Sequence, residues 1–155
     1  MNFRFVIFLV LTASISFAQE LTDLSLAGFV YNSQSRIPFS LEAKLVQFEL
    51  GVHKLRYYGA DGGEPRFICR SLSIALGNQE IAIPEKAFSD LGDIASISPP
   101  FDSENGTWTV TIIGGDAGGS YRVDLIFNNR RLLERKFLDM FSAPEKREYY
   151  NVTKY

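Results

Sequence analysis

The sequence lacks the side chains that build disulfides, zinc sites and most nucleophilic catalytic sets. Its 155 residues include one cysteine, Cys69, and one histidine, His53. One cysteine excludes an intrachain disulfide, and one cysteine with one histidine is too few for a structural zinc site. A histidine-dependent catalytic set would have to rely on His53 alone. We therefore expect no metal, no cofactor and a structural role for His53.

The sequence also lacks a large excess of either charge. It has 16 basic and 18 acidic side chains, which give a formal net charge of −2. That balance is a poor match for the phosphate backbone of nucleic acids, so we expect no nucleic-acid partner. With 46% hydrophobic and 22% charged residues, the composition is that of a folded globular protein, and the length suits one domain.

The N-terminus has the three-part pattern of a secretory signal peptide. Arg4 precedes an apolar run over 5–11, and the small residues Ser16 and Ala18 mark a cleavage site before Gln19. The run is shorter than the about 20 residues that a membrane-spanning helix needs. We therefore predict a signal peptide over 1–18, no membrane span in the mature chain, and export to the periplasm or the extracellular space.

Alternation of apolar and polar residues with period two predicts strands through most of the remaining chain. The clearest segment is 107–112, where three threonines alternate with apolar side chains. Residues 121–127 alternate in the same way, and an Asn-Asn turn separates them from a strand expected over 131–137. The pattern predicts a mainly β fold, either an antiparallel β-sandwich or a partly open barrel, with one short helix.

Two segments are less regular. The alternation over 39–50 slips by one position, which predicts a β-bulge at 45–46. A helix over 40–50 is the alternative for this segment, and it would make the fold α+β. We expect another strand over 24–31, with an irregularity near Gly28.

The middle of the chain carries clear turn signals. A Gly-Asn turn divides 72–83 into the two strands of a hairpin. Pro84 then favours a short helix that ends at a left-handed Gly92, and a loop is expected over 93–106. The apolar neighbours of Cys69 indicate a buried thiol. We divide the mature chain into a β-rich domain over 19–142 and a polar tail over 143–155, which we expect to be frayed or to form a short helix.

Two glycine-rich segments, 59–63 and 114–119, resemble each other, and each carries one acidic residue. The segment 114–119 lacks the Gly-Lys-Ser/Thr pattern of a phosphate-binding loop and precedes a strand, so it is predicted to be a flexible hairpin connection. If the two loops met at one cleft, Asp61 and Asp116 would be the candidate acid–base pair of a small secreted hydrolase.

The most distinct charged feature is a group of basic residues around the Asn-Asn turn, namely Arg122, Arg130, Arg131, Arg135 and Lys136. We expect these cations to cluster at one end and on the outer face of a hairpin. Guanidinium groups bind carboxylate, phosphate and sulfate, which indicates an acidic protein or an anionic glycan as partner. The alternative is that the charges keep an edge strand soluble.

The leading functional hypothesis is an exported, soluble, non-enzymatic binding protein of the inhibitor or envelope-accessory type. Its motivation is the combination of a rigid sheet with arginine-rich and tyrosine-rich surface and the lack of a coherent catalytic set in the sequence. The alternative is the small carboxylate-dependent hydrolase with Asp61 and Asp116.

Overall fold

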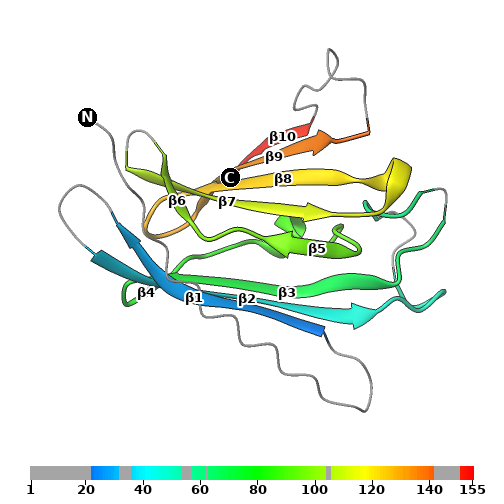
Figure 1. The fold of residues 1–155 in the computed structure, drawn as a ribbon, viewed down its shortest axis with the longest axis horizontal. Helices are drawn as coiled ribbons and strands as arrows, with labels where there is room; N and C mark the ends of the chain where they lie inside the picture. The colour runs from blue at the N-terminus through cyan, green and yellow to red at the C-terminus, as the bar shows by residue number, and fades with distance from the viewer. Residues whose placement is uncertain (1–21, 32–35, 54–56, 62, 104–105, 142–150) are drawn as a thin grey trace.

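The protein is described by a computed structural model that covers 22–31, 36–53, 57–61, 63–103, 106–141 and 151–155. The expected signal peptide and the beginning of the expected tail lie outside these residues. The fold is mainly β and consists of two antiparallel sheets that do not close into a barrel. Figure 1 shows them as two layers, with β1–β4 in blue to green and β7–β10 in yellow to red.

The first sheet has the strand order β1-β2-β3-β4. Its strands are β1 (Thr22–Tyr31), β2 (Arg36–Gln47), β3 (Phe67–Leu76) and the short β4 (Gln79–Glu80). The second sheet has the order β10-β9-β8-β7-β5, and β6 also pairs with β7. Its strands are β5 (Ile94–Ile97), β6 (Phe101–Ser103), β7 (Thr107–Gly114), β8 (Tyr121–Phe127), β9 (Leu132–Asp139) and β10 (Asn151–Lys154).

The hydrophobic core lies between the two sheets and is built from alternate residues of each long strand. The apolar members of the expected strand over 107–112 are all buried, as are those of β8 except Ile126. The largest side chains with almost no exposure are Tyr121, Phe127, Phe137, Leu41, Ile74, Leu91, Ile112, Leu125 and Leu132. Burial of one face of each sheet is the main contribution to the stability of such a sandwich.

The alternative of a helix over 40–50 is wrong, because β2 occupies most of this segment. Leu41, Ala43 and Leu45 all face the other sheet, which only the period of a strand allows. The register between β2 and β3 shifts between Lys44 and Leu45, one position before the bulge predicted at 45–46. The extra residue is Arg70 on β3, so the bulge belongs to the partner strand.

Other local expectations need correction. The β1–β2 ladder runs without a shift past Gly28, so no irregularity is present there. The expected short helix is a 3-10 turn, η1, over Glu85–Ala87, and the left-handed residue after it is Asp93 (φ 46°), not Gly92. The segment 93–106 contains β5 and β6 because both pair with β7. The end of the expected tail forms β10, which pairs with β9. Within the described ranges, no helix is long and apolar enough to cross a membrane.

Candidate functional site

The two glycine-rich loops meet, although they lie more than 50 residues apart in the sequence. The Asp116 N–H donates to the Gly59 carbonyl, at 3.3 Å. The Asp61 N–H donates to Asp116 Oδ1, also at 3.3 Å, and the Gly118 N–H donates to Asp61 Oδ2 at the same distance. Each acidic side chain therefore accepts a hydrogen bond from the backbone of the opposite loop.

The close approach of the two backbones explains the glycines. A Cβ atom at Gly119 would lie 2.8 Å from the Ala60 carbonyl carbon, and one at Gly115 would lie 2.9 Å from Gly59 Cα. Such distances are too short for any side chain, so glycine is needed at both positions. Gly119 is approached by the other loop, whereas Gly115 is approached both by Gly59 of the other loop and by Gly119 of its own.

The meeting of the loops brings the two candidate catalytic residues together, as the hydrolase hypothesis requires. Acid–base hydrolysis also requires two carboxylates that face a substrate between them. Here one oxygen of Asp61 and one oxygen of Asp116 are engaged in holding the opposite loop. This arrangement favours a structural role for both carboxylates.

The structure does not bring the five candidate basic residues together. Arg122 and Lys136 lie on the outer face of β8 and β9, whereas Arg130 and Arg131 are exposed in the turn between these strands. Arg135 pairs with Leu125 and shares its inward face, because neighbouring residues of a strand point to opposite sides. The expected cluster is therefore divided among three places.

Arg135 is buried and holds the second sheet to the segment after η1. Its side chain is 4% exposed, and its terminal nitrogen contacts both carboxylate oxygens of Asp90, at 2.9 and 3.1 Å. Its guanidinium carbon lies 5.6 Å from the centre of the Phe137 ring. Arg135 Nε is buried without a hydrogen-bond partner in the described part of the chain. An external ligand cannot reach this guanidinium, so Arg135 does not belong to a binding surface.

The charges on the outer face of the second sheet are paired. Arg122 Nε lies 2.9 Å from Asp124 Oδ1, and a terminal nitrogen of Arg122 lies 3.0 Å from Oδ2. The Thr111 hydroxyl donates to Asp124 Oδ1 at 2.7 Å. Lys136 pairs with Glu134 at 3.5 Å. Neighbouring side chains leave the Asp124 side chain only 7% exposed, which strengthens its hydrogen bonds relative to those in open water.

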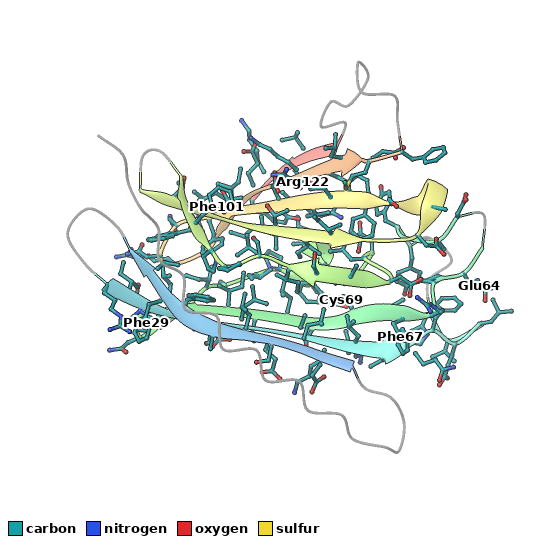
Figure 2. All side chains as sticks on the ribbon, viewed as in Figure 1. Phe29, Glu64, Phe67, Cys69, Phe101 and Arg122 are labelled. Atoms are coloured by element: carbon teal, nitrogen blue, oxygen red, sulfur yellow. The ribbon has the colours of Figure 1, made fainter. Side chains whose placement is uncertain are left out.

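Large apolar side chains surround these pairs. Phe101, Ile113 and Val152 are 46%, 37% and 47% exposed and come from β6, β7 and β10. The register places Ile113 opposite Arg122 and Val152 opposite Lys136, so they share the outer face. Figure 2 shows Phe101 and Arg122 on this sheet. We call Phe101, Ile113 and Val152 the outer apolar group.

The sequence contains only a partial signal for the outer apolar group. Phe101 and Val152 fall in segments expected to be a loop and a tail, so their strand faces could not be assigned. Ile126 occupies a polar position in the alternation of β8, and it is half-buried on the same outer face. Apolar residues at outward positions are unusual in antiparallel sandwiches, whose outer faces are mostly polar.

Cys69 and His53 are the chain's one thiol and one imidazole, and the contacts of both side chains indicate structural roles. Cys69 is buried, as predicted; its burial, with a smaller contribution from the Asp90 carboxylate, raises the pKa of the thiol from 9.0 to about 12. Its reactive thiolate is therefore scarce at neutral pH. His53 Nδ1 accepts a hydrogen bond from the Glu49 N–H at 2.8 Å and so closes the turn after β2.

No group of three or more His, Cys, Asp or Glu side chains is placed to hold a metal ion in the part of the chain that the structure describes. The candidate site is therefore the outer face of the second sheet, with Arg122, Lys136 and the outer apolar group. Comparison of the chain with protein-family models, with curated proteins and with solved structures found no match.

Proposed function

We propose that the chain is an exported, soluble, non-enzymatic interaction protein that binds another protein on the outer face of its second sheet. The observation that carries this proposal is the exposure of the outer apolar group around paired charges. Exposed apolar side chains on a structured face are typical of protein interaction sites, and aromatic residues and arginine are enriched at their centres. The signal-peptide pattern supports export.

A protein suits this face better than an anionic glycan does. An anionic glycan would need guanidinium and ammonium groups that are available for sulfate or carboxylate. Arg122 and Lys136 already contact Asp124 and Glu134, so the face presents little net positive charge. A protein surface with apolar side chains would instead remove Phe101, Ile113 and Val152 from water, which is favourable at about 25 cal/mol per Å².

The test uses matched valine substitutions. Val152→Glu places a charge in the outer apolar group, whereas Val52→Glu places the same charge at an exposed valine in the turn after β2. The processed wild-type protein is cross-linked in its native exported fraction, the captured protein is purified, and binding is measured with both purified proteins. We expect Val152→Glu and Ile113→Glu to weaken binding about tenfold or more, and Val52→Glu to leave it unchanged.

Two results would contradict the proposal. One is equal binding of the captured protein by the Val152→Glu and Val52→Glu variants. The other is retention of the wild-type protein on immobilised heparin at physiological salt combined with loss of retention in an Arg130→Ala, Arg131→Ala double variant. That second result would assign binding to the β8–β9 turn and to an anionic glycan.

A further inference from the structure

One edge of the first sheet is long and has no strand beside it. β1 is the border strand of this sheet, and its ladder with β2 runs from end to end without a shift. Figure 1 shows β1 in blue at the border of the sheet. β6 of the second sheet contacts β1, but no backbone hydrogen bond joins the two strands in the described part of the chain. The side of β1 that faces away from β2 is therefore an open edge.

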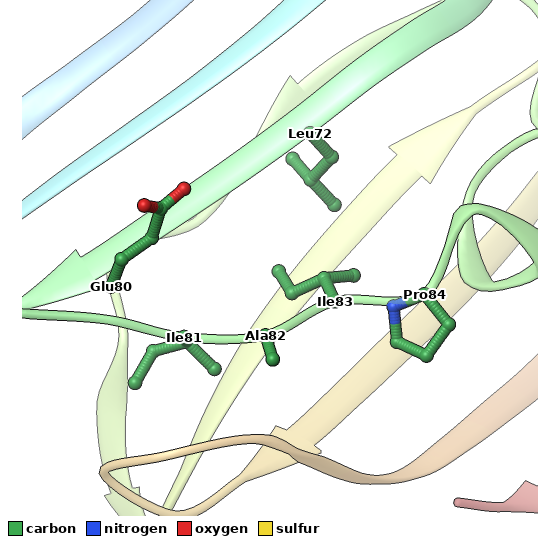
Figure 3. A pocket seen from close by; sticks show the side chains of 6 residues that line it. All are labelled: Leu72, Glu80, Ile81, Ala82, Ile83 and Pro84. Atoms are coloured by element: carbon green, nitrogen blue, oxygen red, sulfur yellow. The ribbon is translucent and has the colours of Figure 1, made fainter.

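The other border strands among the described residues are short. β4 has two residues, β6 has three, and β5 and β10 have four each. After β4 the chain leaves the first sheet, because the Ala82 N–H donates to the Arg130 carbonyl at 3.0 Å. Figure 3 shows this departing segment, with Ala82 and Pro84, next to Leu72 of β3. Soluble proteins usually protect a long edge with proline, lysine or a bulge, and β1 (Thr22–Tyr31) has none of these.

The hydrogen bonds of β2 show which residues of β1 have backbone groups on the open side. The Gly77 N–H donates to the Pro38 carbonyl at 2.7 Å, near the start of β2. The Phe48 N–H donates to the Arg66 carbonyl at 2.9 Å, just after the end of β2. Even-numbered residues of β2 thus bond toward β3, and odd-numbered residues bond toward β1. Because the register pairs odd residues of β2 with even residues of β1, the odd residues of β1 direct their N–H and C=O groups away from β2. These open residues are Asp23, Ser25, Ala27, Phe29 and Tyr31.

The open edge has charges of opposite sign at its two ends. Asp23 is exposed at the start of β1, and within the described residues it has no ion pair. At the other end, the Arg36 guanidinium carbon lies 3.4 Å from the centre of the Phe29 ring, which is 41% exposed. Ala27 lies at the middle of the five open residues, and its side chain is exposed on the outer face. An antiparallel copy of the same edge would therefore place its acidic end beside this basic end.

We propose that two copies of the chain form a dimer in which β1 pairs antiparallel with β1 of the second copy, about a twofold axis at Ala27. In this register Ala27 faces Ala27 of the second copy, Ser25 faces Phe29, and Asp23 faces Tyr31, so each open residue meets another open residue. A register centred on Ser25 would leave Phe29 and Tyr31 without partners in β1.

The twofold axis makes the interface self-complementary. Asp23 lies diagonally across from Phe29 of the second copy, where the Arg36 guanidinium lies over the ring, and the symmetry produces this opposite-charge contact twice. The backbone groups of the two edges satisfy each other, and the two first sheets become one continuous sheet. The recognition mode is strand addition, in which the main chain supplies most of the affinity. This interface belongs to the first sheet and is separate from the outer apolar group.

The test depends on the fact that a residue on a twofold axis faces its own copy. Ala27→Lys places two ammonium groups opposite each other, and Ala27→Glu places two carboxylates there, so each variant should dimerise at least tenfold more weakly than the wild type. An equimolar mixture of the two variants should form a heterodimer, because opposite charges then meet. Ala82→Lys, the same change at an exposed alanine after β4, should dimerise like the wild type. Analytical ultracentrifugation of the processed full-length proteins measures each association.

Amide hydrogen exchange locates the interface. Raising the protein concentration should slow exchange of the Ala27 amide, which faces the open side, and leave the Leu26 amide, which bonds to β2, unchanged. Ile113→Glu should not alter dimerisation, so failure of this proposal is distinguishable from failure of the outer-face proposal. Fluorescence of the buried Trp108 verifies that each variant is folded.

Three results would overturn the proposal. The first is a wild-type protein that remains monomeric at concentrations up to about 1 mM. The second is equal dimerisation of the Ala27→Lys and Ala82→Lys variants. The third is a mixture of the Ala27→Lys and Ala27→Glu variants that associates no more strongly than either variant alone, because the two copies would then not meet at Ala27.

Discussion

Removal of Asp90 should destabilise the protein far more than removal of its partner Arg135. Asp90→Ala leaves the Arg135 guanidinium buried without its carboxylate, and loss of one partner of a buried pair typically costs about 3–5 kcal/mol. The Asp90 side chain is itself 32% exposed, so water can enter the space it leaves and solvate part of the charge. We therefore expect Asp90→Ala to lower the unfolding free energy by about 2–3 kcal/mol.

Arg135→Met should behave differently. It removes the buried charge together with the Nε atom that has no hydrogen-bond partner in the described residues, and it keeps an apolar side chain next to Phe137. Replacement of a buried ion by an apolar residue of similar volume is often neutral, so the expected change is within about 1 kcal/mol. The double variant Asp90→Ala, Arg135→Met should then resemble Arg135→Met alone.

Urea denaturation followed by Trp108 fluorescence measures all three variants, because this buried residue is the one tryptophan in the chain. The order of stabilities decides the outcome. If Arg135→Met proves more destabilising than Asp90→Ala, the pair contributes net stability and the reasoning about an uncompensated buried charge is refuted. Additive effects in the double variant would refute it as well, because the two side chains would then act independently.

Three further predictions concern the loops, the thiol and the N-terminus. Gly119→Ala forces a Cβ against the backbone of Ala60 and should lower the unfolding free energy by about 1–3 kcal/mol. At the control position, a Cβ added by Gly63→Ala meets no atom within 4 Å, so this variant should change the unfolding free energy by less than about 0.5 kcal/mol. Similar losses in the two variants would show that the loops do not pack as described. The raised pKa of Cys69, about 12, means that the unfolded thiol ionises near pH 9 while the folded thiol remains neutral, so stability should fall as pH rises above about 9. Denaturation of Cys69→Ala over the same pH range should lack this part of the decline, and an identical decline would exclude the thiol as its cause. N-terminal sequencing of the exported protein should begin at Gln19, and a mature chain that retains 5–11 would contradict signal cleavage.

Period-two patterning predicted most of the long strands but left β2 open, because the burial of one strand face is recorded in neighbouring residues only where the alternation is regular. The segments 107–112 and 121–127 illustrate this, since all of their apolar residues except Ile126 are buried. The short strands β5 and β6 have too few residues for a pattern and form because they pair with β7. Whether 40–50 is a helix or a strand is likewise decided by pairing with β1 and β3, which local sequence does not record.

The candidate site was predictable only in part for the same reason. The similarity of the glycine-rich loops is visible in the sequence, but their contact depends on how the two sheets pack. Arg135 and Lys136 are sequence neighbours within one strand, so only one of them can face outward. The register with β8 places Lys136 outside and Arg135 inside, and a count of nearby basic residues could not make that distinction.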